Sequence, residues 1–138
     1  MATYPLMIDS TDVLLKRISD AQHFVELGRE EIVTGIEKKN EYTVRQGFEK
    51  LFHALSSVYV AKIFNYTSYN SYPRNHDALE HELEYLNMSK EAHFFSQIKE
   101  LMHGRIYYQG ETSSFRLGEQ YIESIEAEIK SCIQQITG

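Results

Sequence analysis

The chain has one cysteine and no tryptophan among its 138 residues. Because Cys132 is alone, an intrachain disulfide and a zinc site built from cysteines are excluded. Its place among Ile129, Ile133 and Ile136 predicts a packed thiol. The chain's seven glycines are scattered, so it has no glycine-rich phosphate loop, and it has no Gly-x-Ser-x-Gly nucleophile elbow either.

Positive charge is also scarce. Fourteen Lys and Arg stand against 20 Asp and Glu, which gives a formal net charge of -6. A broad surface for duplex nucleic acid needs a dense array of Lys and Arg, so this composition argues against one and leaves room only for a local basic site. The N-terminus has no basic leader and no stretch approaches membrane-spanning length. We therefore predict one cytoplasmic domain over residues 1–138, without membrane association.

Apolar residues recur at spacings of three and four along most of the chain, which predicts helices. The first helix is predicted to begin after a cap at Ser10 or Thr11 and to end at Asn40. Its inward stripe consists of Leu14, Ile18, Ala21, Val25, Ile32 and Ile36. The second, over residues 41–65, has apolar residues around most of its circumference and is predicted to be the most buried.

Three further helices are predicted after a loop over residues 65–75. They cover residues 76–86, residues 89–110, and the chain from Ser113 or Ser114 onward. In the helix over 89–110, Arg105 and Tyr108 fall on the continuation of the inward stripe. The last helix is predicted to bury Leu117, Tyr121, Ile125, Ile129, Cys132 and Ile136. The resulting fold class is all-α: an antiparallel four-helix bundle with an additional short helix. The broad apolar coat of the second helix predicts a homodimer.

Residues 101–109, LMHGRIYYQ, form the first candidate site, where His103, Arg105, Tyr107 and Tyr108 lie within two turns. A guanidinium next to an apolar stripe needs an anion to offset its desolvation, which predicts a phosphate clamp. The structural alternative is an arginine that passes the helix end or pairs with Glu49.

His53 could face His103 across the bundle, or be a hydrogen-bonded core residue.

The loop after the second helix is the other candidate site. It carries Tyr66, Tyr69, Tyr72, Arg74 and His76, which could stack a base and hold a phosphate. Alternatively, the three tyrosines cover the open end of the bundle.

A metal site is not predicted. Glu100 with His103 and Asp20 with His23 have the carboxylate–histidine spacing of di-iron bundles, but two further inward carboxylates are lacking. The HDALEHELE segment lacks the residue order of a zinc protease. We therefore expect no metal and no cofactor.

Three segments together resemble the HEPN superfamily of helical bundles: RQGFEKLFHALSSVYVAKIF, the HDAL that begins at His76, and LMHGRIYY. The resemblance covers about residues 10–136 in layout. It is closest to an archaeal branch with a Leu-His-x-x-Phe-Tyr pattern, whose positions Met102, His103, Ile106 and Tyr107 occupy here. This resemblance implies a dimer, often one paired with a small nucleotidyltransferase, and in active members metal-independent RNA cleavage through an Arg-x4-6-His motif.

That motif is absent after Arg105, because no histidine follows at the required spacing. Arg74 and His81 have the spacing but lie in the loop and the short helix, so we treat the match as coincidental unless both line one cleft. The predicted function is therefore a HEPN-like dimer that binds a nucleotide, RNA or a partner protein. The alternatives are a metal-independent RNase that uses Arg105 and His103, and a purely structural interaction module.

Overall fold

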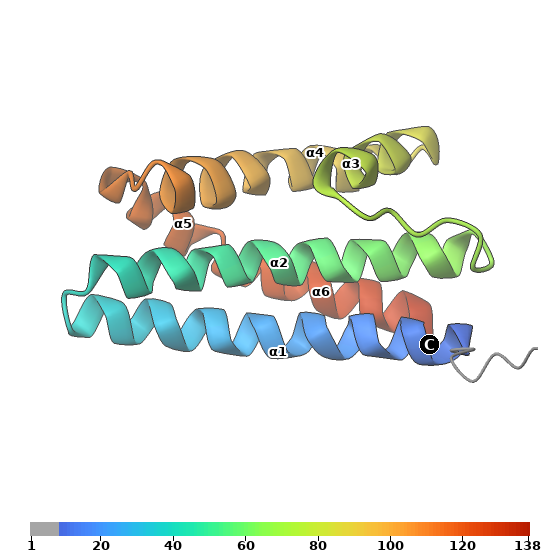
Figure 1. Ribbon diagram of the computed structural model, residues 1–138, viewed down its shortest axis with the longest axis horizontal. Coiled ribbons are helices and arrows are strands. Elements are labelled where there is room, and N and C mark those ends of the chain that lie inside the picture. The colour runs from blue at the N-terminus through green and yellow to red at the C-terminus, as the bar shows by residue number, and fades with distance from the viewer. Residues whose placement is uncertain (1–8) are drawn as a thin grey trace, which may run out of the picture.

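The structure, a computed structural model, describes residues 9–138, and this part of the chain is all-helical and without strands (Figure 1). The helices are α1 (Ser10–Glu37), α2 (Glu41–Tyr66), α3 (His76–Tyr85), α4 (Ser89–Ile98), the π-helix η1 (Lys99–Tyr108), the 3-10 turn η2 (Thr112–Ser114), α5 (Phe115–Gln120) and α6 (Ile122–Thr137). No helix of this part is both long and apolar enough to cross a lipid bilayer. The all-α class is confirmed.

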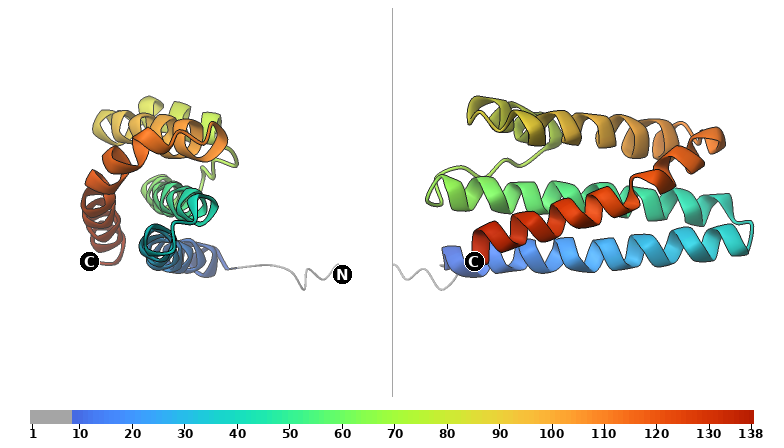
Figure 2. Two further views of the ribbon diagram at one scale, coloured as in Figure 1. Left: turned by 90° about the vertical axis from the view of Figure 1, so that its left-hand side faces the viewer. Right: turned by 180° about the vertical axis from the view of Figure 1, so that it is seen from behind.

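The two longest helices, α1 and α2, run antiparallel side by side over their full lengths (Figures 1 and 2). The cap of α1 is Asp9, whose carboxylate accepts from the amide of Thr11 at 2.8 Å, so the prediction of Ser10 or Thr11 was wrong by one or two positions. An aspartate fits, because an ionised carboxylate also favours the positive end of the helix dipole. The chain then reverses between Lys38 and Asn40, and the side chain of Asn40 caps α2.

Glycines allow α1 and α2 to approach closely. A Cβ on Gly47 would lie 2.7 Å from the backbone oxygen of Gly28, and a Cβ on Gly28 would lie 2.8 Å from that of Gly47. Neither contact is possible for real atoms without movement of a backbone. The two positions therefore set the distance between the helices.

As predicted, α2 is the most buried element. It lies between α1 on one side and α3, α4 and η1 on the other, and α6 crosses behind it in the view of Figure 1. Phe48, Phe52 and Tyr59 are completely buried. Tyr59 donates to Glu128 of α6 at 2.5 Å, and Lys62 pairs with Glu91 of α4 at 2.5 Å, so polar contacts also tie α2 to both neighbours.

The helix predicted over residues 89–110 is continuous, but its second half is a π-helix. A π-helix places more residues in each turn than an α-helix does. Leu101 and Met102 are both buried, and the next residue of η1 to reach the core is Ile106, five positions after Leu101. Arg105 and Tyr108, which an α-helix would have continued along the stripe, point outward instead, and Tyr108 is 68% exposed.

The last predicted helix is two helices with a break at Tyr121. In α5 the residue against the core is Gly118, where a Cβ would lie 2.6 Å from the ring of Phe48, whereas Leu117 is 39% exposed. The break lets α6 place Ile125, Ile129 and Cys132 inward. The burial of Cys132 was predicted correctly, and that of Leu117 was not.

We predict that Gly47→Ala lowers the free energy of unfolding by about 1–3 kcal/mol, because the added methyl group must separate α1 from α2. The measurement is urea unfolding followed by circular dichroism. Gly104→Ala is the matched control, since a Cβ there meets only the oxygen of Lys99 at 3.8 Å. Equal stability of the two variants would contradict the role assigned to the glycine contact.

Candidate functional site

A carboxylate in the middle of the apolar helix α2 organises the candidate site. Glu49 is only 8% exposed, and its two oxygens lie 2.9 and 2.8 Å from Nδ1 of His103 on η1. One helical turn along α2, Nε2 of His53 lies 3.4 Å from the same carboxylate. Because a carboxylate oxygen accepts hydrogen bonds, this contact orients the imidazole of His103 with Nδ1 toward Glu49 and Nε2 away from it.

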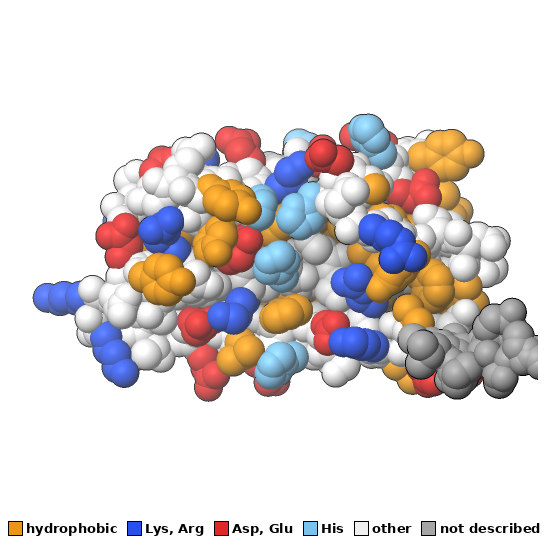
Figure 3. All heavy atoms as spheres, in the orientation of Figure 1, with side chains coloured by type: hydrophobic (Ala, Val, Ile, Leu, Met, Phe, Trp, Pro, Cys, Tyr) orange, Lys and Arg blue, Asp and Glu red, His pale blue; other side chains and the backbone are white. Residues whose placement is uncertain are grey.

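His76 completes a cluster of three histidines. It is the first residue of α3, after the cap Asn75. Its ring centroid lies 5.0 Å from that of His103 and 6.2 Å from that of His53, and the ring of Phe52 packs against His76 and His103. Figure 3 shows histidine side chains grouped in the middle of this face of the molecule. We call His53, His76 and His103 with Glu49 the histidine cluster.

The charge environment of His76 disfavours its protonated form. Desolvation lowers its pKa, and so do the other two histidines and Lys99, while Glu49 acts in the opposite direction. At neutral pH the imidazole of His76 is therefore neutral. An anion bound beside it would favour the protonated form.

A cavity of about 280 Å³ adjoins the histidine cluster, between α1, α2 and the segment that precedes α3. Its basic lining residues are Arg17, Arg74, His53 and His76. We call it the arginine cavity. No lining residue that belongs to the described chain, 9–138, is acidic. The amino-terminal end of α3, which carries the positive end of the helix dipole, also borders it.

Tyr72 holds the arginines of this cavity in place. Nε of Arg17 donates to the hydroxyl of Tyr72 at 2.6 Å, and the guanidinium carbons of Arg17 and Arg74 lie 5.0 and 5.5 Å from the centroid of its ring. Such cation–π contacts fix the planar groups without neutralising their charge. The loop tyrosine thus positions cations.

A second, smaller cavity of about 210 Å³ lies at the end of η1 and is lined by Tyr42, Arg45, Gln46, Tyr107 and Tyr108. We call it the tyrosine cavity. The ring of Tyr108 lies 4.7 Å from that of His103, so this cavity borders the histidine cluster on the side away from Arg17 and Arg74.

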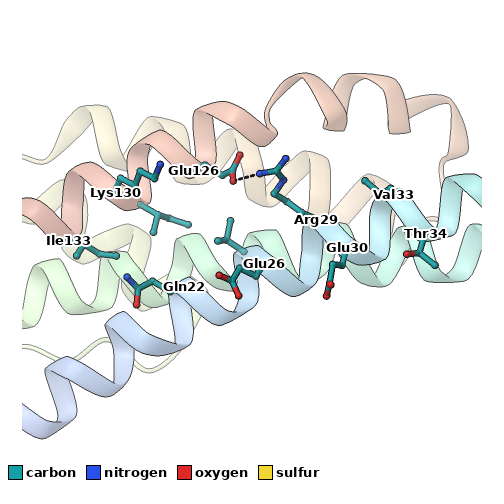
Figure 4. Close-up of a pocket in the computed structure, with 11 residues that line it drawn as sticks. Gln22, Glu26, Arg29, Glu30, Val33, Thr34, Glu126, Lys130 and Ile133 are labelled. Carbon is teal, nitrogen blue, oxygen red and sulfur yellow. Dashed lines mark hydrogen bonds and ion pairs between the residues drawn. The ribbon is translucent and has the colours of Figure 1, made fainter.

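A third cavity, about 930 Å³, is an open groove between α1 and α6 (Figure 4). Its apolar lining includes Val25, Val33, Ile129 and Ile133. Charges of both signs border it, and Arg29 bridges to Glu126 at 2.8 Å. Its described lining residues include no histidine and no concentration of one charge sign.

The structure brings together some of the predicted site residues and separates others. His53, Arg74 and His76 line one cavity, and His103 meets His53 through Glu49. His53 is 44% exposed, so it is not the core residue that one interpretation made of it.

Arg105 lies apart from the histidine cluster. It pairs with Glu111, beyond the end of η1, at 3.1 Å, which raises its pKa. Of the two structural alternatives, the ion pair with Glu49 was therefore wrong. The reason is its place two residues after His103, which puts the two side chains on different faces of a helix.

Three other residues of the loop and α3, namely Tyr66, Tyr69 and His81, are not among those that line the arginine cavity. Tyr69 packs on Phe64 with ring centroids 4.9 Å apart, and Tyr66 is exposed, so neither faces the arginine cavity. His81 lines a different depression from Arg74, beside Tyr85. The Arg74 and His81 spacing therefore remains coincidental.

Sequence patterns did not indicate Arg17 or Arg45 as site residues. Each lies on a helix far in sequence from its partners, Tyr72 and Tyr107. The only local signal is a cation at the edge of an apolar stripe, which is usually a solvated side chain. Among residues 9–138 no group of three or more His, Cys, Asp or Glu side chains has an arrangement that could hold a metal ion.

No match supplies a family. No protein-family model matches this chain, and comparisons with curated proteins and with solved structures find no similar protein. The features that bear on function are therefore the arginine cavity, the tyrosine cavity and the histidine cluster between them.

We predict that acid destabilises the protein partly through His76. Its folded-state pKa is lowered, so above pH ~6.5 the imidazole is neutral in both states and contributes no pH dependence. As the pH falls below that value, the unfolded chain takes up the proton first, and stability is lost until the pH passes the folded-state pKa. The groups that face His76 are His53, His103, Lys99 and Glu49.

The measurement is the free energy of unfolding between pH 7.5 and 5 for wild type and His76→Gln, which should show a shallower loss. His93→Gln, at an exposed position on α4, controls for the removal of a histidine as such. Parallel curves for wild type and His76→Gln would rule out this contribution.

Proposed function

We propose that this chain is a HEPN-like four-helix-bundle protein that binds phosphate groups of a nucleotide or of single-stranded RNA in the arginine cavity. The observation that carries the proposal is the meeting of Arg17, Arg74, His53 and His76 around about 280 Å³ without an acidic lining residue, in a protein of net charge -6. An acidic protein that gathers positive groups in one concave site gains an anion-binding site there.

The chemistry of the lining fits phosphate. Guanidinium groups present planar sets of donors that match phosphate oxygens, and Tyr72 holds those of Arg17 and Arg74 in fixed planes. A neutral His76 can accept a proton when an anion enters. The amides at the start of α3 add the positive end of a helix dipole.

Arg74→Gln should weaken binding of a fluorescently labelled single-stranded RNA by about 10- to 100-fold, the equivalent of one charge-assisted hydrogen bond of ~1.5–3 kcal/mol. The measurement is fluorescence anisotropy at two salt concentrations, because phosphate contacts weaken with salt. The control is Lys16→Gln, which removes the same charge from the residue before Arg17 in the sequence, an exposed lysine that pairs with Asp20. Equal effects of both substitutions, or none from either, would disprove the specific site.

A second function, metal-independent RNA cleavage, is supported by the pair His76 and His103. Their rings lie 5.0 Å apart; Glu49 orients one, and the other is neutral at neutral pH. In such a reaction one imidazole would take the proton of a ribose 2′-hydroxyl as its oxygen attacks phosphorus. The other would protonate the departing 5′-oxygen, which leaves a 2′,3′-cyclic phosphate. In this proposal the phosphate-binding group is Arg74, and not Arg105.

The binding assay with EDTA present also scores cleavage by gel electrophoresis. Cleavage products that disappear in His103→Gln but persist in His93→Gln would establish ribonuclease activity. If wild type leaves the RNA intact, the cleavage proposal fails and only the binding proposal stands.

We also propose a homodimer through the groove between α1 and α6. A twofold interface uses the same patch on both subunits, so it must complement itself. The lining of this groove can complement itself, because it combines apolar residues with acidic Glu26 and Glu30 and with basic Arg29 and Lys130. Val33, 55% exposed at its edge, would be covered in such a dimer. A nucleotidyltransferase-type partner would occupy a different face.

Val33→Asp should convert the dimer to a monomer in analytical ultracentrifugation, since a carboxylate buried in the contact would have no partner. Leu117→Asp, which adds the same charge at an exposed apolar position on α5, should leave the dimer intact. A wild-type monomer at high concentration, or dissociation by both variants, would reject this seam.

A further inference from the structure

The tyrosine cavity is the second concave site on the face that carries the histidine cluster. Its lining consists of three tyrosines, one arginine and one glutamine. The rings of Tyr42 and Tyr108 are exposed, while Tyr107 is half-buried between them and the helix. Exposed aromatic rings around a hollow need a reason, because they are costly to leave in water and specific in what they bind.

The π-helix places two of these rings beside one imidazole. Tyr107 and Tyr108 follow His103 by four and five residues, and the wide π-helical turn brings both next to it. The ring of Tyr107 is nearly parallel to that of His103, at 12°, with centroids 6.4 Å apart, and the ring of Tyr108 meets it edge-on at 4.7 Å. The histidine that Glu49 fixes therefore also fixes one wall of the tyrosine cavity.

Arg45 provides a rigid opposite wall. Its Nε donates to the carbonyl of Ile106 at 3.2 Å and its Nη2 donates to that of Tyr107 at 2.5 Å, at the negative end of η1. Gly110, with φ +64°, lies so close that a Cβ there would be 3.3 Å from the guanidinium carbon. The guanidinium is thus held as a flat surface, and no carboxylate of residues 9–138 forms an ion pair with it.

We infer that the tyrosine cavity is a base-binding subsite for a short single-stranded oligonucleotide whose phosphate occupies the arginine cavity. The inference rests on the proposed phosphate binding and adds how the rest of the ligand is held. Tyrosine rings and a guanidinium plane stack on any nucleobase, and the amide of Gln46 offers both a donor and an acceptor to its edge. The cavity volume, about 210 Å³, is about seven water volumes, the scale of one ring system.

Two features favour a base over a peptide side chain. None of the residues that line this cavity within the described chain is aliphatic, whereas pockets that anchor a protein partner depend on a packed apolar centre. The tyrosine cavity also connects to the arginine cavity through adjacent rings, from Tyr108 to His103 at 4.7 Å and from His103 to His76 at 5.0 Å. A ligand with alternating flat and anionic groups fits this sequence of surfaces.

The test compares an RNA tetranucleotide with an otherwise identical abasic tetranucleotide, both labelled with the same fluorophore, by anisotropy. Tyr108→Ala should weaken binding of the tetranucleotide by about 5- to 100-fold, the range for loss of one stacked base, and leave the abasic ligand unaffected. Tyr108→Phe keeps the ring and should bind both ligands as wild type does. Tyr85→Ala, at an exposed tyrosine on α3, is the matched control.

Equal loss for the two ligands in Tyr108→Ala would overturn the inference, since the tyrosine would then act on the phosphate cavity and not on a base. An unchanged affinity for both would also overturn it. If either of these outcomes occurs while wild type binds the tetranucleotide and Arg74→Gln does not, the phosphate site stands and only the base subsite is rejected. If wild type binds neither ligand, the proposed function fails, and the subsite fails with it.

Discussion

The arrangement of this site depends on one buried carboxylate. Burial of the charge of Glu49 within the apolar helix α2 is costly unless hydrogen bonds compensate it. His103 supplies both contacts from η1, and His53 adds a third group from one turn away. The same interaction therefore stabilises the charge, joins η1 to α2 and fixes the orientation of the His103 ring. Loss of the carboxylate would affect packing and site together.

The π-helix determines which residues share that site. Its wide turn moves Ile106 into the core and turns Arg105 outward to Glu111, while Tyr107 and Tyr108 both reach His103. π-helical turns are less stable than α-helical ones and occur often at functional sites. In this chain the buried contacts of η1 with α2 hold the turn, and the outcome is a row of rings between two cavities.

Most of the fold could be predicted from periodicity, because burial of an apolar face repeats every three to four residues in any helix. The bounds of α2 and the inward position of Cys132 follow from that rule. The π-helix and the break at Tyr121 could not, because both change the phase of the pattern without a proline to indicate the change. The sequence identified His53, Arg74 and His76 as candidate site residues. That they line one cavity could not be predicted, because the cavity depends on contacts between segments far apart in the sequence. Arg17 shows this limit, since only its contact with Tyr72 distinguishes it from a solvated cation.

The contrast between local and overall charge constrains the ligand. With a net charge of -6, the protein as a whole repels a long polyanion, and the repulsion acts over about 8–10 Å at physiological salt. Under the proposed function, a ligand short or flexible enough to place its phosphates inside the arginine cavity would gain from Arg17 and Arg74 without facing the acidic surface. A rigid duplex would not, whereas a single strand would bend into the cavity and present a base to the neighbouring rings. Under the proposed function, proton uptake by His76 would couple to occupancy, because a bound phosphate would favour the protonated imidazole.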